Sequence, residues 1–118
     1  MPSAGVRGFS RVIRSRQRLV HMVHADVDGT GTAALNSGSQ ELTLTDNGVG
    51  DYNLAFAIKP QRVLSVQVSS KTADSVLQVA AVSTTTMQIL GFDATDGTTA
   101  KDVDFYISVA VSDSADEV

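Results

Sequence analysis

Two histidines and several aspartates of this sequence could bind a metal ion. His21 and His24 stand three residues apart, a spacing that shares a face on a helix but not on a strand. The surrounding residues 17–27 mix Val, Leu and Met without helical periodicity, so we expect a strand. The histidines should then point to opposite sides and make separate hydrogen bonds, without a shared metal.

The aspartates offer oxygen ligands, but not at the spacing of a known calcium loop. Asp26 and Asp28 resemble the start of such a loop, yet the twelfth position counted from Asp26 is Ser37, where a glutamate is needed. A second group could take a cation or form a solvated acidic turn, which we favour: Asp93, Asp96, Asp102 and Asp104. We therefore expect no metal and no cofactor.

The sequence offers little for catalysis. It has no cysteine, which excludes disulfides, thiolate zinc sites and thiol nucleophiles. It has no Gly-x-Ser-x-Gly turn of the kind that exposes a nucleophilic serine. Nothing in the order of the acidic residues predicts two carboxylates in one cleft. We expect no catalytic residues and no enzyme.

Positive charge is concentrated at the start of the chain. Residues 1–18 hold five arginines and no acidic side chain, while the other hundred residues hold four basic and thirteen acidic ones, a net charge of −9. We divide the chain into a basic N-terminal arm (1–18), a body (19–112) and an acidic tail (113–118). The arm should bind a partner through Arg7, Arg11, Val12, Ile13, Arg14, Arg16 and Arg18.

An acidic protein surface is the partner that we expect for the arm, and another copy of the body would provide one. Arginine also suits nucleic-acid phosphates. However, the body is acidic and Phe9 is the only aromatic residue of the arm, which argues against nucleic acid. An Arg-rich, acid-free start also fits a mitochondrial transit peptide, which we do not favour, and it lacks the apolar stretch of a secretory signal. No apolar run is long enough to span a membrane.

The body reads as a series of short strands separated by turns. Residues 28–31, 47–48 and 93–102 contain Gly, Asn and Asp in turn patterns, and Asn47-Gly48 predicts a hairpin. We expect loops at 36–39 and 71–75. The predicted strands are 17–27, 41–45, 51–58, 63–68, 76–82, 85–92 and 103–111.

Alternation of apolar and polar residues predicts which side chains face the core. In 51–58 the inward set is Tyr52, Leu54, Phe56 and Ile58, and in 103–111 it is every second residue from Val103 to Val111. No segment predicts a helix. We expect an all-β fold: an antiparallel β-sandwich of jelly-roll or Ig-like type, with seven to eight strands and an extended N-terminal arm.

Two stretches resemble β-sandwich modules of tailed-bacteriophage virion proteins, which occur in capsid decoration proteins and in head or tail fibres. Residues 43–60 show a strand, a Gly-x-Gly turn, a Tyr-x-apolar-x-Phe segment and a proline. Residues 87–111 show a strand, an Asp/Gly loop and a closing strand. The resemblance is carried by Gly48, Gly50, Tyr52, Leu54, Phe56, Pro60, Asp102, Phe105, Ile107 and Val109.

The resemblance implies a structural virion protein without catalytic residues. Our hypothesis is a protein on the capsid exterior that decorates or cements a bacteriophage capsid and is anchored by its basic arm. Its partners would be the major capsid protein, other virion proteins or further copies of itself. Two alternatives remain open: a fibre or receptor-binding module that uses loops 71–75 and 93–102, and a ring-forming neck or tail adaptor whose charge division supplies complementary faces.

Overall fold

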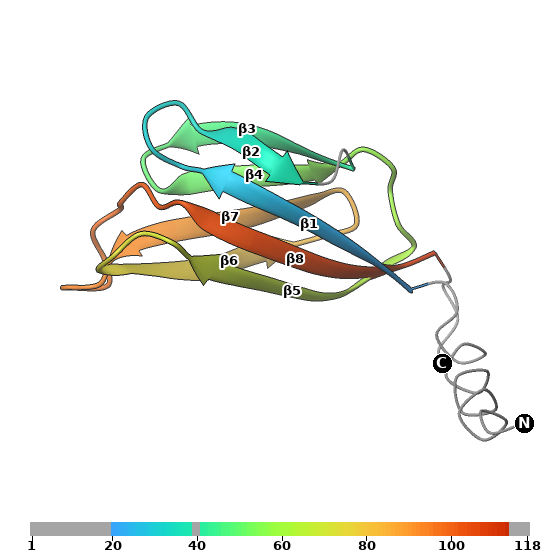
Figure 1. The fold of residues 1–118 in the computed structure, drawn as a ribbon. Coiled ribbons are helices and arrows are strands. Elements are labelled where there is room, and N and C mark those ends of the chain that lie inside the picture. Colours follow the sequence, from blue (N-terminus) through green and yellow to red (C-terminus); the bar gives the residue numbers. More distant parts are fainter. Residues whose placement is uncertain (1–19, 39–40, 114–118) are drawn as a thin grey trace, which may run out of the picture.

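The computed structural model describes residues 20–38 and 41–113, so the basic arm and residues 114–118 lie outside the described residues. Regular structure in the described part is entirely β (Figure 1). The eight strands are β1 (Val20–Asp28), β2 (Ala34–Gly38), β3 (Leu42–Gly48), β4 (Asp51–Phe56), β5 (Arg62–Ser70), β6 (Ser75–Val82), β7 (Thr86–Asp93) and β8 (Phe105–Ser112).

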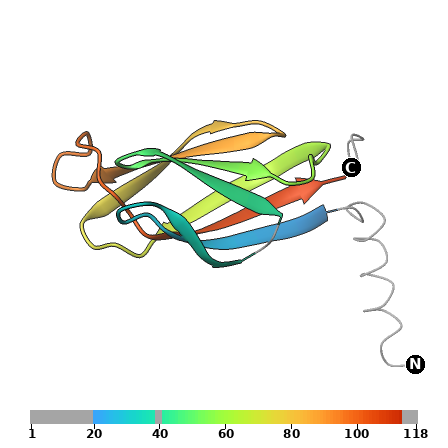
Figure 2. The ribbon, with the colours of Figure 1, turned by 90° about the horizontal axis from the view of Figure 1, so that it is seen from above.

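The strands form two four-stranded antiparallel sheets. The first has the order β2-β1-β8-β5 and the second β3-β4-β7-β6. The two sheets face one another as layers, which Figure 2 shows from above. The prediction of an all-β antiparallel sandwich is confirmed.

The core lies between the sheets and follows the alternation of the sequence. In β8, Phe105, Ile107 and Val109 are buried while Tyr106 between them is half-exposed, so the predicted inner face of this strand is confirmed. Facing side chains from both sheets complete the core: Val23, Ala25, Val27, Leu42, Tyr52, Leu54, Met87, Ile89, Val103 and Val111. Because this core contains few aromatic rings, its stability rests on close packing of aliphatic side chains.

The structure corrects the prediction of a loop at 36–39. Residues 34–38 form β2, an edge strand that pairs with β1 through Ala25 opposite Gly38 and Val27 opposite Leu35, with a register shift between Asp26 and Val27. Asn, Ser and Gly are typical of turns, so composition alone predicts a loop here. Pairing with β1 overrides that local preference.

Two details of the β3–β4 region also differ from expectation. The predicted hairpin is present, but Gly48 pairs with Asp51, so the turn lies at Val49 and Gly50 and follows Asn47-Gly48. The alternation of the sequence predicts that Ile58 faces the core, but its side chain is 80% exposed. The reason is that β4 ends at Phe56, after which the chain leaves the sheet.

The strands run between two opposite ends of the sandwich (Figure 1). One end holds the start of β1, the turns at 57–61 and 83–85, and the end of β8; we call it the arm end, because the arm precedes β1 in the sequence. The other holds residues 29–33, 49–50, 71–74 and 94–104; we call it the loop end. In the described part of the chain, no helix is long and apolar enough to cross a membrane.

Candidate partner-binding site

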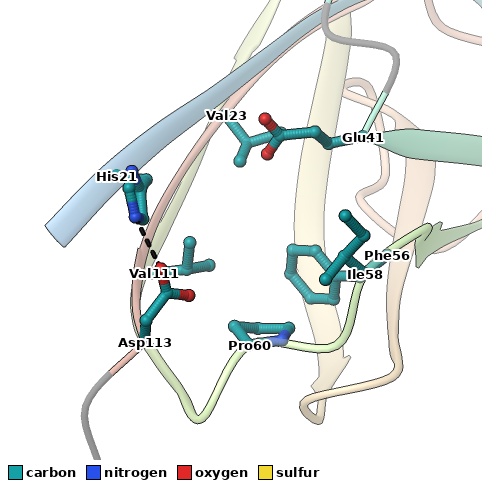
Figure 3. Close-up of a pocket in the computed structure, with 8 residues that line it drawn as sticks. All are labelled: His21, Val23, Glu41, Phe56, Ile58, Pro60, Val111 and Asp113. Carbon is teal, nitrogen blue, oxygen red and sulfur yellow. Dashed lines mark hydrogen bonds and ion pairs between the residues drawn. The ribbon is translucent and has the colours of Figure 1, made fainter. Parts of the chain in front are cut away.

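A pocket of about 170 Å³ opens at the arm end (Figure 3). It lies between the start of β1, the end of β8 and the segment that leaves β4. Its lining is His21, Val23, Glu41, Phe56, Ile58, Pro60, Val111 and Asp113. These residues come from both sheets, so the pocket exists only because the sandwich closes around it.

The segment 57–61 forms one wall and is held at both ends by backbone hydrogen bonds. The Ala57 amide donates to the Glu41 carbonyl at 2.8 Å, and the Gln61 amide donates to the Ser112 carbonyl at 3.0 Å. Pro60 between them is buried and fixes the local backbone torsion. The segment is therefore tied at one end beside β3 of the second sheet and at the other end to β8 of the first sheet. We expect the pocket to be preformed for this reason.

The base of the pocket is apolar. Val23 and Val111 are 1% and 5% exposed, and Phe56 is half-buried beside them. Ile58 stands at the rim with 80% of its surface exposed, the largest value among the exposed large apolar side chains of the described residues. An exposed isoleucine next to a pocket offers apolar area that a partner could cover.

The rim of the pocket is acidic. The Nε2 atom of His21 lies 2.7 Å from the Oδ2 atom of Asp113, and both side chains are about half exposed. Glu41 lies across the pocket from Asp113, and its side chain extends toward Val23 (Figure 3). An apolar base with two carboxylates at its rim suits a ligand that carries an aliphatic group beside positive charge.

The histidines point to opposite faces of β1, as the sequence predicts. His21 lies at the pocket, whereas the Nδ1 atom of His24 is 2.9 Å from the Ser108 hydroxyl on the outer face of the first sheet. Among the described residues, no three His, Asp or Glu side chains gather into a group that could hold a metal ion. The structure therefore does not bring the two histidines together.

The aspartates of the loop end are engaged as hydrogen-bond acceptors for the loops. Asp104 accepts from the Gly29 amide at 2.9 Å and from the Thr30 hydroxyl at 3.2 Å. Asp96 accepts from the Thr99 hydroxyl and from the amides of Thr99 and Thr98, which lowers the pKa of its carboxyl to about 2. These carboxylates shape the loops instead of converging on one point.

Tyr52 joins three segments of the loop end. Its hydroxyl accepts a hydrogen bond from the Val103 amide at 3.1 Å and lies within donating distance of the Gly29 carbonyl (3.1 Å) and the Asp102 carboxylate (3.3 Å). Burial is the main cause that raises the pKa of this phenol to about 12, and the Asp102 charge adds to it. The ring packs against Phe105 at a centroid distance of 5.5 Å.

Six of the ten residues that carry the phage-module resemblance fall into two places. Gly48, Gly50, Tyr52 and Phe105 build the turn and the core at the loop end, whereas Phe56 and Pro60 line the pocket. The predicted binding residues of the arm lie outside the described residues: Arg7, Arg11, Val12, Ile13, Arg14, Arg16 and Arg18.

Sequence reasoning did not single out Glu41 or Asp113. They are 72 residues apart in the sequence and meet at one pocket through the pairing of β3 with β4 and of β1 with β8. No local pattern marks either residue, so only the register of the strands could have identified them.

Comparison of the chain with protein-family models, curated proteins and solved structures finds no match. The pocket, the loops and the charge division therefore carry the functional argument.

Proposed function

We propose that this protein is a structural virion component that decorates or cements a bacteriophage capsid from its exterior and is attached by its basic arm. The observation that carries the proposal is the division of charge, with five arginines in residues 1–18 and a net −9 in the remainder. The resemblance of residues 43–60 and 87–111 to phage β-sandwich modules supplies the class of particle. Neither argument involves a catalytic step.

The position of the arm in the sequence supports attachment at one end. The arm precedes β1, whose first residues lie at the arm end of the sandwich. β1 has nine residues, which corresponds to a strand of about 30 Å. If the arm holds the body on a surface, the loop end should therefore lie about 30 Å from that surface.

The attachment is electrostatic with a smaller apolar contribution. Arginine binds carboxylates through two parallel hydrogen bonds, so the arm suits an acidic protein surface. Val12 and Ile13 add apolar area between the charges. Ordering an extended segment costs conformational entropy, which leaves each contact weak. Repetition of the same contact over a capsid lattice compensates through multivalency.

Cosedimentation with phage heads stripped of this protein tests the proposal. The test variant is Arg11→Gln/Arg14→Gln/Arg16→Gln. The control is Ser65→Glu/Gln67→Glu/Ser69→Glu, which changes the net charge equally on exposed positions of β5. We expect the full chain and the β5 control to pellet with heads at low salt, and the arm variant to stay in solution.

Increasing salt should release the full chain, because the attachment depends on charge. Equal binding by the arm variant and the full chain would reject arm anchoring. Binding to isolated tails or to host surface, without binding to heads, would instead support the fibre alternative.

A further inference from the structure

We propose that the pocket at the arm end receives residues 11–14 of a second copy of this chain, so that copies join arm to pocket. This inference deepens the proposed function by naming a partner for the arm. It rests on the pocket's chemistry and on the order of residues in the arm, and it does not require a capsid.

The chemistry of the pocket matches that of the segment Arg11-Val12-Ile13-Arg14. The segment places two aliphatic side chains between two positive charges, and the pocket places an apolar base between two carboxylates, Glu41 and Asp113. A cavity of about 150 Å³ holds a molecule the size of benzene, so one branched aliphatic side chain fits this pocket. Ile58 at the rim would be covered by the docked segment.

A second copy is the occupant that the sequence favours. For a chain to fill its own pocket, residues 11–14 would have to turn back just before β1 begins at Val20. No Gly, Pro, Asn or Asp occurs from Phe9 to Ala25, and the turn-favouring residues of this stretch are only Ser10 and Ser15. Docking into the pocket of a neighbour places no such demand on residues 15–19.

The contact joins two different surfaces, the arm of one copy and the pocket of the next. Such a contact closes as a dimer when two copies exchange arms reciprocally, and otherwise propagates into a ring or an open chain. It also accounts for the charge division within one molecule, because each copy carries both the cationic and the anionic partner.

Light scattering on donor and acceptor variants tests the inference without heads, in nuclease-treated samples at low salt. The donor-defective variant is Arg11→Gln/Arg14→Gln, and the acceptor-defective variant is Glu41→Gln/Asp113→Asn. We expect the full chain to form dimers or larger oligomers, and each variant alone to be monomeric. A mixture of the two variants should form dimers and nothing larger, because each retains the half that the other lacks.

Two further variants separate docking from folding and from total charge. Ile58→Ser removes apolar area at the rim but leaves the core intact, and we expect about tenfold weaker association with unchanged urea unfolding. Asp28→Asn/Asp74→Asn removes two carboxylates from the loop end and should associate like the full chain.

A monomeric full chain, a mixture that stays monomeric, or equal loss of association in the loop-end variant would overturn the inference. If oligomers that are present before nuclease treatment disappear after it, the inference also fails, and nucleic acid becomes the favoured ligand of the arm. If the full chain binds heads through its arm but never associates with itself, the proposed function stands and this inference fails. If the full chain associates with itself but does not bind heads, this inference stands and the proposed function fails.

Discussion

The Tyr52 hydroxyl offers the sharpest test of how the loop end is held together. In Tyr52→Phe the ring can keep its place against Phe105, since only the hydroxyl is removed. The Val103 amide then loses its acceptor, and the Gly29 carbonyl and the Asp102 carboxylate lose a donor that they share. Val103 is fully buried, so water cannot replace the lost partner at its amide without a rearrangement.

Leaving the buried Val103 amide unpaired costs about 1–3 kcal/mol. Losing the hydrogen bond that the Tyr52 hydroxyl donates costs about 1 kcal/mol more. We therefore expect Tyr52→Phe to lower the free energy of unfolding by about 2–4 kcal/mol. The measurement is urea unfolding at neutral pH. The control is Tyr106→Phe, which removes the same atom from a half-exposed ring and should change stability by less than about 0.5 kcal/mol.

Alkaline pH probes the same hydroxyl independently. The phenol's pKa is raised from 10.0 to about 12 in the folded state, so the neutral form is favoured by folding. Its contribution is fully present below pH 10 and is lost as the pH rises toward 12. This loss should be absent in Tyr52→Phe. A Tyr52→Phe variant as stable as Tyr106→Phe, with an unchanged alkaline profile, would refute the role given to this hydrogen-bond cluster.

Further predictions concern the turns of the loop end. Gly50 has a φ of 63°, and a Cβ there would lie 2.5 Å from the Gly91 carbonyl oxygen, whereas Gly31 has a φ of 66° and open space. Gly50→Ala should therefore lower the unfolding free energy by at least about 2 kcal/mol and Gly31→Ala by about 1 kcal/mol; equal losses in urea unfolding would contradict the crowding at Gly50. The pKa of Asp96 is lowered from 3.8 to about 2, so its hydrogen bonds should persist at pH 3 and be lost as the pH falls through 2. The amide NMR signal of Thr99 reports this, and a midpoint near 4 would argue against the bonds. Heads stripped of this protein should also bind the full chain less as salt rises from about 0.05 to about 0.5 M, because the Debye length shortens; salt-independent pelleting would exclude an electrostatic anchor.

Much of the fold could be predicted because period-two alternation is a local signal. The alternate residues of 103–111 directly indicate the inner face of β8, and Asn47-Gly48 indicates a hairpin within two residues of its true turn. By contrast, β2 depends on pairing with β1, and Ile58 is exposed because the chain leaves β4 two residues earlier. Both outcomes are decided by contacts distant in the sequence, which composition does not encode.

The candidate site was less accessible to prediction than the fold. The sequence shows Phe56 and Pro60 as parts of a fold pattern, and their place at a pocket follows only from the path of residues 57–61 between the sheets. The sequence offers His21 as a metal ligand, yet its side chain lies beside Asp113, 92 residues away. The charge division between arm and body, in contrast, is visible in the sequence without any structure.

The most direct test of the central claim is to locate the arm in assembled particles. A photo-crosslinking amino acid in place of Val12 would capture whatever the arm contacts, and mass spectrometry would identify the linked peptide. Attachment to a capsid predicts crosslinks from position 12 to capsid protein peptides rich in acidic residues, joined by peptides around Glu41 and Pro60 where copies also contact each other. Crosslinks confined to nucleic acid, or particles in which position 12 links to no protein, would contradict the account.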